Sequence, residues 1–139
     1  MTNFEDQPLG YLLHRLASAL RPEVTAALKP LGLGLPEFVC MRLLSLFPGK
    51  SSAELARDAN VSPQAMNMVL RGLEKAGAVT RPASVASGRA LPAQLTRDGV
   101  VLLKRAEAAV RSADDRVLAN LTPAERRELK RLLGSLGEG

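Results

Sequence analysis

The sequence predicts a mainly α-helical chain that carries one small β element. Apolar residues recur three and four positions apart over most of the 139 residues, which is the spacing that one buried helix face requires. Serine, threonine and proline stand where several of these segments begin, as helix caps and first-turn residues do. Only the stretches 78–82 and 89–95 have the composition of short strands. We therefore expect helices throughout, interrupted once by a hairpin.

Composition limits the class of protein. Hydrophobic residues make up 46% of the chain but only four residues are aromatic, so the core must be aliphatic. The single cysteine, Cys40, allows no intramolecular disulfide and no cysteine-based metal site. No apolar run approaches the length of a membrane span, and residues 1–10 do not resemble a signal peptide. We expect one cytoplasmic domain, or one subunit of an obligate dimer, with no membrane association and no metal or cofactor.

Residues that often carry catalysis are scarce in this chain. His14 is the only histidine, no Gly-rich phosphate loop occurs, and no carboxylates cluster at metal-binding spacing. The chain is therefore not expected to be an enzyme.

A long helical pattern begins at Pro8 and continues to about Leu31, and the segment 31–34 ends it. Pro22 falls inside this pattern. Because an interior proline removes a hydrogen bond and clashes with the preceding turn, we expect a kink or a break near Arg21. The helix has more apolar residues than one monomer needs, which suggests a subunit interface.

Two shorter helices are expected next. Pro36 begins the first, which runs to about Phe47. Ser51 and Glu54 form a capping box that opens the second, because each of these side chains can accept a backbone N–H of the first turn. The first of the two is expected to be almost wholly buried, through Phe38, Val39, Met41, Leu43, Leu44 and Leu46.

The helix expected from Ser62 to Ala76 has two contrasting faces. Ser62 is a preferred N-cap, Pro63 suits the first helical position, and Gly77 favours a stop. The inward face is an apolar stripe at helical spacing, made of Met66, Val69, Leu70 and Leu73. The outward face has amides and cations but no carboxylate: Gln64, Asn67, Met68, Arg71 and Lys75.

This outward face predicts contact with DNA. Amide side chains can pair with adenine edges in a major groove, and arginine can pair with guanine or a phosphate. A short helix, a tight turn at 60–61 and this second helix together make a helix-turn-helix. The alternative is an ordinary surface helix with a polar face.

The two expected strands follow directly, with a small and flexible hairpin tip at 84–88 between them. Pro82 and Pro92 limit strand pairing and favour edge strands. A helix-turn-helix followed by a basic hairpin is a winged helix. Arg89 lies beside the tip, where it can enter a minor groove, since the negative potential there attracts cations.

Positive charge gathers in this part of the chain. The net charge is +5, and the segment from Ser62 to Arg97 holds five cations against Glu74 alone. Concentrated positive charge implies a polyanionic partner, with nucleic acid first. The alternative is a solvated basic face without a partner.

Two more helices complete the chain. Thr96 caps a long one to about Asn120, and a capping box from Thr122 to Glu125 opens the last. The apolar side of the long helix is expected to consist of Val100, Leu103, Ala106, Val110, Ala113, Val117 and Leu118. Surplus apolar surface at both ends of the chain suits a two-fold helical bundle. We expect residues 1–34 and 97–139 to form a dimerisation region around a winged helix-turn-helix at 35–96.

Several motifs, taken in their order and spacing, resemble the MarR family of bacterial transcription regulators. They lie at 35–38, 52–56, 61–64, 73–79 and 95–99, together with the wing arginine Arg89. The resemblance covers nearly the whole chain. It implies a homodimer that binds a palindromic operator in double-stranded DNA, usually represses, and is often released by a small aromatic acid such as salicylate.

The chain departs from the family pattern at two places. Members usually have Asp-Arg at the wing tip, whereas this chain has Gly88-Arg89. Met68 and Gly72 stand where relatives often have polar or basic residues. The departures bear on the operator sequence more than on DNA binding itself.

The DNA-contacting roles fall into three groups. Gln64, Asn67 and Arg71 are expected at base edges, and Met68 against a thymine methyl. Phosphate contacts are expected from Ser62 and Lys75. Of the remaining arginines, Arg89 is expected in the minor groove, and Arg81 and Arg97 at the DNA backbone or in support of the wing.

The family resemblance implies an effector pocket between the dimer helices and the winged domain. An arginine would pair with a carboxylate, and rings would flank an aromatic ligand. The candidates are Tyr11, His14, Arg15, Phe38 and Arg42. For His14 the alternative is a hydrogen-bonded interface residue, and for Arg42 a structural ion pair.

Two alternatives concern regulation. Some relatives sense oxidants through a cysteine near the first helix, and Cys40 could do so from a different position. Lone cysteines in apolar runs, however, are usually buried and inert. The other alternative is a winged-helix protein without a small-molecule effector.

Overall fold

The computed structural model describes residues 3–81 and 92–137. The predictions for Pro82, the tip at 84–88 and Arg89 lie outside these described residues. Short 3-10 turns, η1 (Phe4–Asp6) and η2 (Lys29–Leu31), flank the first helix. The helices and strands are α1 (Leu9–Leu28), α2 (Leu35–Leu46), α3 (Ser52–Ala59), α4 (Pro63–Lys75), β1 (Val79–Thr80), β2 (Gln94–Leu95), α5 (Arg97–Val117) and α6 (Pro123–Ser135). The expected mainly α-helical fold with a small β element is confirmed.

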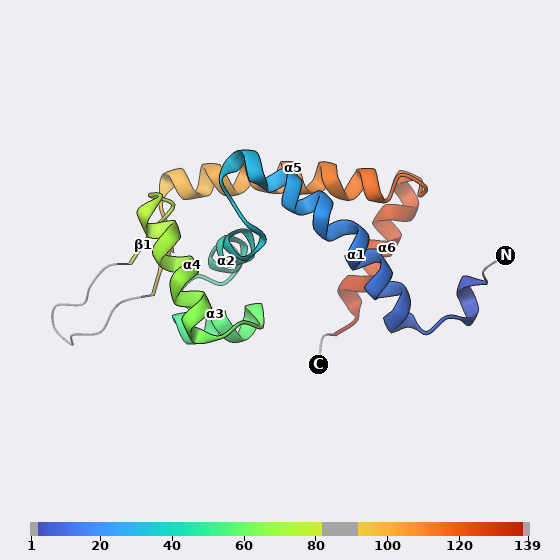
Figure 1. The fold of residues 1–139 in the computed structure, drawn as a ribbon, viewed down its shortest axis with the longest axis horizontal. Coiled ribbons are helices and arrows are strands. Elements are labelled where there is room, and N and C mark those ends of the chain that lie inside the picture. Colours follow the sequence, from blue (N-terminus) through green and yellow to red (C-terminus); the bar gives the residue numbers. More distant parts are fainter. Residues whose placement is uncertain (1–2, 82–91, 138–139) are drawn as a thin grey trace.

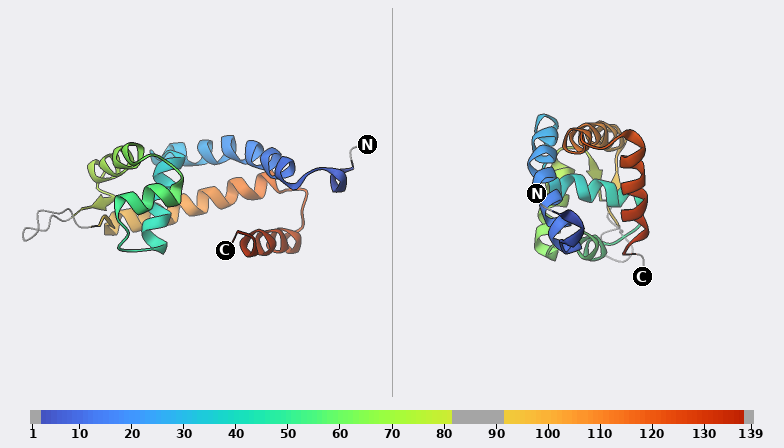
Figure 2. Two further views of the ribbon diagram at one scale, coloured as in Figure 1. Left: turned by 90° about the horizontal axis from the view of Figure 1, so that it is seen from below. Right: turned by 90° about the vertical axis from the view of Figure 1, so that its right-hand side faces the viewer.

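The molecule is elongated, with α1 and α5 side by side along it (Figures 1 and 2). The short helices α2, α3 and α4 gather at one end, next to the two strands (Figure 1). α6 lies towards the other end, on the side of the N-terminus (Figure 1). The predicted dimerisation region and the predicted winged domain have one hydrophobic core in common. Residues of α1 and α5 pack in it together with the short helices: Val24, Leu28, Leu103 and Ala106. The domain boundaries at 34 and 97 remain a prediction.

The core lies where the short helices meet the end of α1. It is aliphatic, as composition predicts, and Phe38 is the only aromatic side chain buried in the described part of the chain. The largest fully buried side chains are Leu28, Met41, Leu55, Met66, Leu70 and Leu73. These residues come from α1, α2, α3 and α4, so burying them fixes the helix-turn-helix on the long helices.

Both predicted capping boxes are present. The Ser51 hydroxyl accepts the N–H of Glu54 at 3.1 Å, and the Glu54 carboxylate accepts the N–H of Ser51 at 3.0 Å. The same pair of bonds joins Thr122 and Glu125 at 3.2 and 2.8 Å. Each box satisfies two backbone donors that the helix itself leaves free, so local sequence alone begins these helices.

The two strands pair antiparallel, with Val79 opposite Leu95. Their junctions with the flanking helices are tight: the Thr96 hydroxyl donates to the carbonyl of Gly77 at 2.6 Å, and the Ala78 carbonyl accepts the N–H of Thr96 at 3.0 Å. The end of α4 is therefore tied directly to the start of α5.

Of the kink or break expected near Arg21, the break is wrong, because α1 continues through Pro22 as one helix. Pro22 and Ser18, whose carbonyl loses its helical donor, are both exposed, so water can solvate the freed group. The expected burial of Leu46 is also wrong, because this residue is 57% exposed. Val100, expected on the apolar side of the long helix, is 41% exposed. Leu46 is the last residue of α2, beyond the reach of the core, and Val100 lies on the outer side of the first turn of α5.

No single helix among the described residues is long and apolar enough to cross a membrane. Only the pair Leu9–Leu31 and Leu35–Leu46 meets that length and composition when taken together, across a bend of 80°. Within the same described residues, no group of three or more His, Cys, Asp or Glu side chains could hold a metal ion.

Candidate nucleic-acid interface and effector pocket

α4 presents its predicted polar face to the outside. Met66, Leu70 and Leu73 are buried against the core, which fixes how the helix is turned. The predicted DNA-contacting side chains lie opposite: Gln64, Met68, Arg71 and Lys75 are exposed, and Asn67 is half-buried. Met68 is 73% exposed, the highest value among the large hydrophobic residues that stand out from the surface. Most of the predicted contact face of α4 is therefore accessible to a partner.

Ser62 acts first as the N-cap of α4. Its hydroxyl oxygen accepts the N–H of Ala65 at 3.1 Å, so the hydroxyl proton stays available to a phosphate oxygen. The N-terminus of α4 also concentrates partial positive charge, which attracts a phosphate group. The phosphate contact predicted for Ser62 is compatible with its capping role, and it remains a prediction.

Arg81 and Arg97 lie differently. The Nε of Arg81 is 3.5 Å from Glu74 of α4, and its Nη2 is buried without a hydrogen-bond partner among the described residues. Arg81 therefore joins β1 to the end of α4, which favours support of the wing over contact with DNA. Arg97, the first residue of α5, is exposed.

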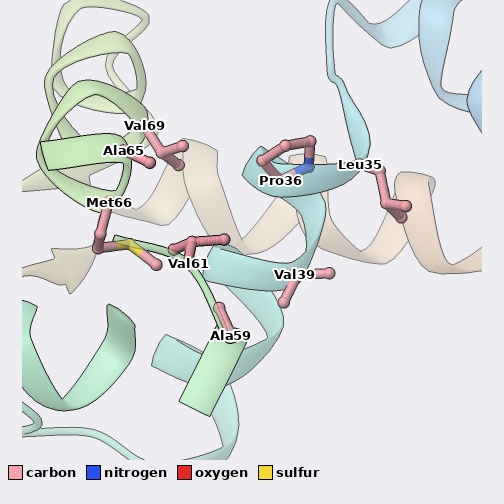
Figure 3. A pocket seen from close by; sticks show the side chains of 8 residues that line it. All are labelled: Leu35, Pro36, Val39, Ala59, Val61, Ala65, Met66 and Val69. Atoms are coloured by element: carbon pink, nitrogen blue, oxygen red, sulfur yellow. The ribbon is translucent and has the colours of Figure 1, made fainter. Parts of the chain in front are cut away.

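Behind α4 lies an apolar cavity of about 290 Å³ that the sequence analysis did not anticipate (Figure 3). Met66 and Val69 reach it from α4, and Pro36 and Val39 reach it from α2 (Figure 3). The remaining lining residues are Leu35, Ala59, Val61 and Ala65. None of these eight side chains carries a polar group, so this apolar cavity offers no counter-ion to a carboxylate.

A second hollow of about 240 Å³ lies between α2 and α5, and it brings together two of the five predicted effector residues, Phe38 and Arg42. The other lining residues come from α5 and were missed by the sequence analysis: Glu107, Val110, Arg111 and Asp114. Their spacing of three and four places them on one helix face, but only the fold shows that this face meets α2. We call these six residues the α2–α5 hollow.

Charges in the α2–α5 hollow are balanced and partly buried. Glu107 pairs with Arg42 at 3.8 Å and with Arg111 at 3.7 Å, so the ion pair that the sequence analysis left open for Arg42 is present. Asp114 lies at the same hollow, and burial raises the pKa of its carboxyl group because the ionised form loses hydration.

The other three predicted effector residues lie apart from this hollow. Arg15 stacks over the rings of Phe4 and Tyr11, with its Cζ 5.4 and 5.9 Å from the ring centres. It lines a separate hollow of about 280 Å³ with residues of α1 and Val117. His14 is exposed. Within one chain Phe38 and Arg42 therefore lie at a different hollow from Arg15, and the effector role of all five residues remains a prediction.

Cys40 is fully buried in α2. Burial raises the pKa of its thiol to about 11, the nearby Glu37 carboxylate adds to this, and Arg81 opposes it. The thiol is therefore protonated at neutral pH, and a buried thiol reacts poorly with oxidants.

A helix-turn-helix with a polar and basic outer face, followed by an antiparallel strand pair, defines a winged helix-turn-helix protein. Residues 33–91 match the model of the MarR family. The chain is also 68% identical over 133 residues to the HTH-type transcriptional repressor Rv2887 of Mycobacterium tuberculosis (strain ATCC 25618 / H37Rv), covering 96% of both proteins. The chain belongs to the MarR family of transcription regulators.

Solved structures give the same result. The Mycobacterium tuberculosis MarR family protein Rv2887 in complex with DNA has a TM-score of 0.85 and 64% identity, covering 96% of this chain and all (100%) of that one. Its complex with salicylic acid has a TM-score of 0.82 and 68% identity, covering 96% and 98%. Wild-type MarR from E. coli, at 23% identity over 94% and 98% of the two chains, has the same fold with a TM-score of 0.80.

Proposed function

We propose that this protein is a homodimeric transcriptional repressor that binds a palindromic operator and is released by a small aromatic carboxylate. The observation that carries the proposal is the outer face of α4, where amides, a cation-rich end and an exposed methionine face solvent while the opposite face is locked into the core. The relative Rv2887, of which a complex with DNA has been solved, supports operator binding by the same fold.

Dimer formation is supported by apolar side chains that one chain leaves uncovered. None of the 13 described residues of α6 is buried, although the helix is amphipathic. Large apolar side chains are exposed on α6, directly after it, and at the start of α1: Leu132, Leu133, Leu136, Leu9, Tyr11 and Leu13. A second copy across a two-fold axis would cover them, and binding to both halves of an operator requires that this axis separate the two α4 helices by about one DNA turn, roughly 34–36 Å.

An aromatic carboxylate suits the α2–α5 hollow better than the apolar cavity. Arg42 and Arg111 can pair with a carboxylate, and Phe38 and Val110 can pack against a ring. Complexes of Rv2887 with salicylic acid and with p-aminosalicylic acid support this class of effector. A ligand that favours a different spacing of the two α4 helices would lower DNA affinity by shifting the population of conformations.

We further infer that the protein acts in the cytoplasm, where its DNA is, and that it has no catalytic activity. Regulation through Cys40 is the less favoured alternative because its thiol is buried and protonated. Peroxide-treated protein is therefore expected to bind DNA with unchanged affinity, as measured by fluorescence anisotropy. A loss of binding that a thiol reductant restores would contradict this.

Fluorescence anisotropy on the DNA upstream of the protein's own gene tests the proposal. We expect tight binding by dimers that weakens steeply as salt rises, because bound cations release counterions from the phosphates. Millimolar salicylate should weaken it further. DNA binding that salicylate leaves unchanged would contradict the proposed effector. The absence of any salt-sensitive, sequence-specific DNA binding would contradict the proposed role as a transcription regulator.

A further inference from the structure

Glu107 lies at the centre of the charges in the α2–α5 hollow. One of its carboxylate oxygens is 3.8 Å from Nη1 of Arg42, and the other is 3.7 Å from Nη2 of Arg111. Both distances exceed the 2.7–2.9 Å or so of a direct charge-assisted hydrogen bond. Glu107 therefore pairs with both guanidinium groups by charge attraction rather than through close hydrogen bonds.

The two arginines remain accessible to a ligand. Their side chains are 44% and 70% exposed, whereas that of Glu107 is 25% exposed. Arg42 and Arg111 each keep N–H donors that Glu107 does not use, because one contact to each carboxylate oxygen leaves most of the five guanidinium donors free. The floor beside them is apolar, with Phe38 7% exposed and Val110 half-buried.

Glu107 is also chemically the same group that the proposed effector would bring. A salicylate-like molecule is ionised at neutral pH and presents its carboxylate to the same two guanidinium groups. Two carboxylates at one pair of arginines repel each other, as like charges at short range do. An incoming carboxylate must therefore displace the Glu107 side chain, or bind more weakly because the Glu107 charge repels it.

We propose that Glu107 is an internal competitor of the effector, which holds Arg42 and Arg111 in the free protein and is displaced by an aromatic carboxylate. This rests on the proposed function, because it takes an aromatic acid as the effector. Glu107 then sets the affinity for the effector. It acts as a specificity-determining residue, and the arginines are the groups that touch the ligand.

This competition predicts that the affinity for salicylate rises when the charge of Glu107 is removed. Glu107→Gln keeps the shape of the side chain but removes its negative charge, so the arginines are freed. We expect this variant to bind salicylate roughly two- to fivefold more tightly than the unchanged protein, a range typical of exposed ion pairs. Salicylamide, which has no carboxylate, should bind the two proteins equally.

Titration calorimetry on the full-length dimer provides the test, at one pH and one salt concentration. Asp58→Asn is the matched control, because it also removes one carboxylate charge from an ion pair. Asp58 lies on α3, pairs with Lys50 and does not line the hollow. This variant should leave salicylate affinity unchanged. In a double variant, Arg42→Ala should reduce the gain from Glu107→Gln, since part of that gain acts through the contact between these two side chains.

A second variant keeps the test decisive if Glu107→Gln disturbs folding. Glu107→Asp retains the charge but shortens the side chain, so it should give a smaller gain. Equal or weaker salicylate binding by soluble, dimeric Glu107→Gln, with binding by the unchanged protein intact, would overturn this inference alone. Salicylate that binds none of the proteins while operator binding persists would overturn both the inference and the proposed effector.

Discussion

At the scale of single residues, Gly99 is the glycine, among those in the described part of the chain, where packing leaves least room for a side chain. It lies in the first turn of α5, and a Cβ added there would stand 2.0 Å from the carbonyl oxygen of Ala78. The obstacle is backbone, which cannot rotate away as a side chain can. The same carbonyl accepts the N–H of Thr96, so the close approach belongs to the junction between the strands and α5.

Gly99→Ala is therefore expected to destabilise the protein by about 1–3 kcal/mol, the usual cost of forcing a group into a packed site. Gly72→Ala is the control: a Cβ there meets nothing within 4 Å, and in a helix interior alanine should stabilise by about 0.5–1 kcal/mol. Urea unfolding at fixed protein concentration measures both. A Gly99→Ala protein as stable as the unchanged one would contradict the close contact.

Asp114 gives a prediction about pH. Burial raises the pKa of its carboxyl group above that in the unfolded chain, and Lys130 offsets part of this. The folded state thus favours the protonated form, and the associated stability is lost as pH rises through the folded pKa. Asp114→Asn, which cannot ionise, is expected to show a slightly higher thermal midpoint at neutral pH.

The advantage of Asp114→Asn should vanish below the pKa of an unfolded aspartate, about 3.9, because both side chains are then neutral. Thermal unfolding across this pH range checks the sign. A variant that is less stable than the unchanged protein at neutral pH would show that pairing with Lys130, and not burial, dominates.

At the scale of elements, α4 combines a fixed inner face with a free outer one. Met66, Leu70 and Leu73 anchor it, Ser62 caps its first turn, and Arg81 pairs with Glu74 near its end. A rigid helix gives its outer side chains defined positions relative to base edges, so changes on that face should alter DNA binding without unfolding the domain.

Alanine substitutions at Arg71 and Lys75 should weaken DNA binding in different ways. Arg71→Ala, at a predicted base edge, is expected to cost about 1–3 kcal/mol on the operator and to weaken discrimination against altered operators. Lys75→Ala, at a predicted phosphate, should weaken all sequences alike and reduce the salt slope by about one. Anisotropy titrations on operator and scrambled DNA separate the two, and identical behaviour would reject the assigned roles.

At the scale of the whole molecule, one chain leaves apolar side chains of α6 exposed, and α6 lies far from α4 (Figures 1 and 2). Leu133→Glu, on α6, places a charge where the proposed dimer buries a leucine, so it should shift the protein towards monomers and abolish tight operator binding. Leu46→Glu is the control, since Leu46 is also exposed but lies at the end of α2. Light scattering gives the mass, and a dimeric Leu133→Glu would contradict this interface.

Local sequence determined a large part of this structure. The capping boxes at Ser51 and Thr122, the cap at Ser62 and the inward stripe of α4 depend on residues within a turn or two of each other, so they can be identified without the fold. The polar outer face of α4 followed from the same spacing. The aliphatic core followed from composition.

Only the tertiary structure decided which distant faces meet. Arg42 and Glu107 are far apart in sequence, and their pairing depends on how α2 crosses α5. The unbroken course of α1 through Pro22 and the exposure of Leu46 and Val100 depend likewise on which surfaces are covered by neighbours and which face water. Helix periodicity marks a face as apolar, but it carries no information about whether another element, or a second chain, lies against that face.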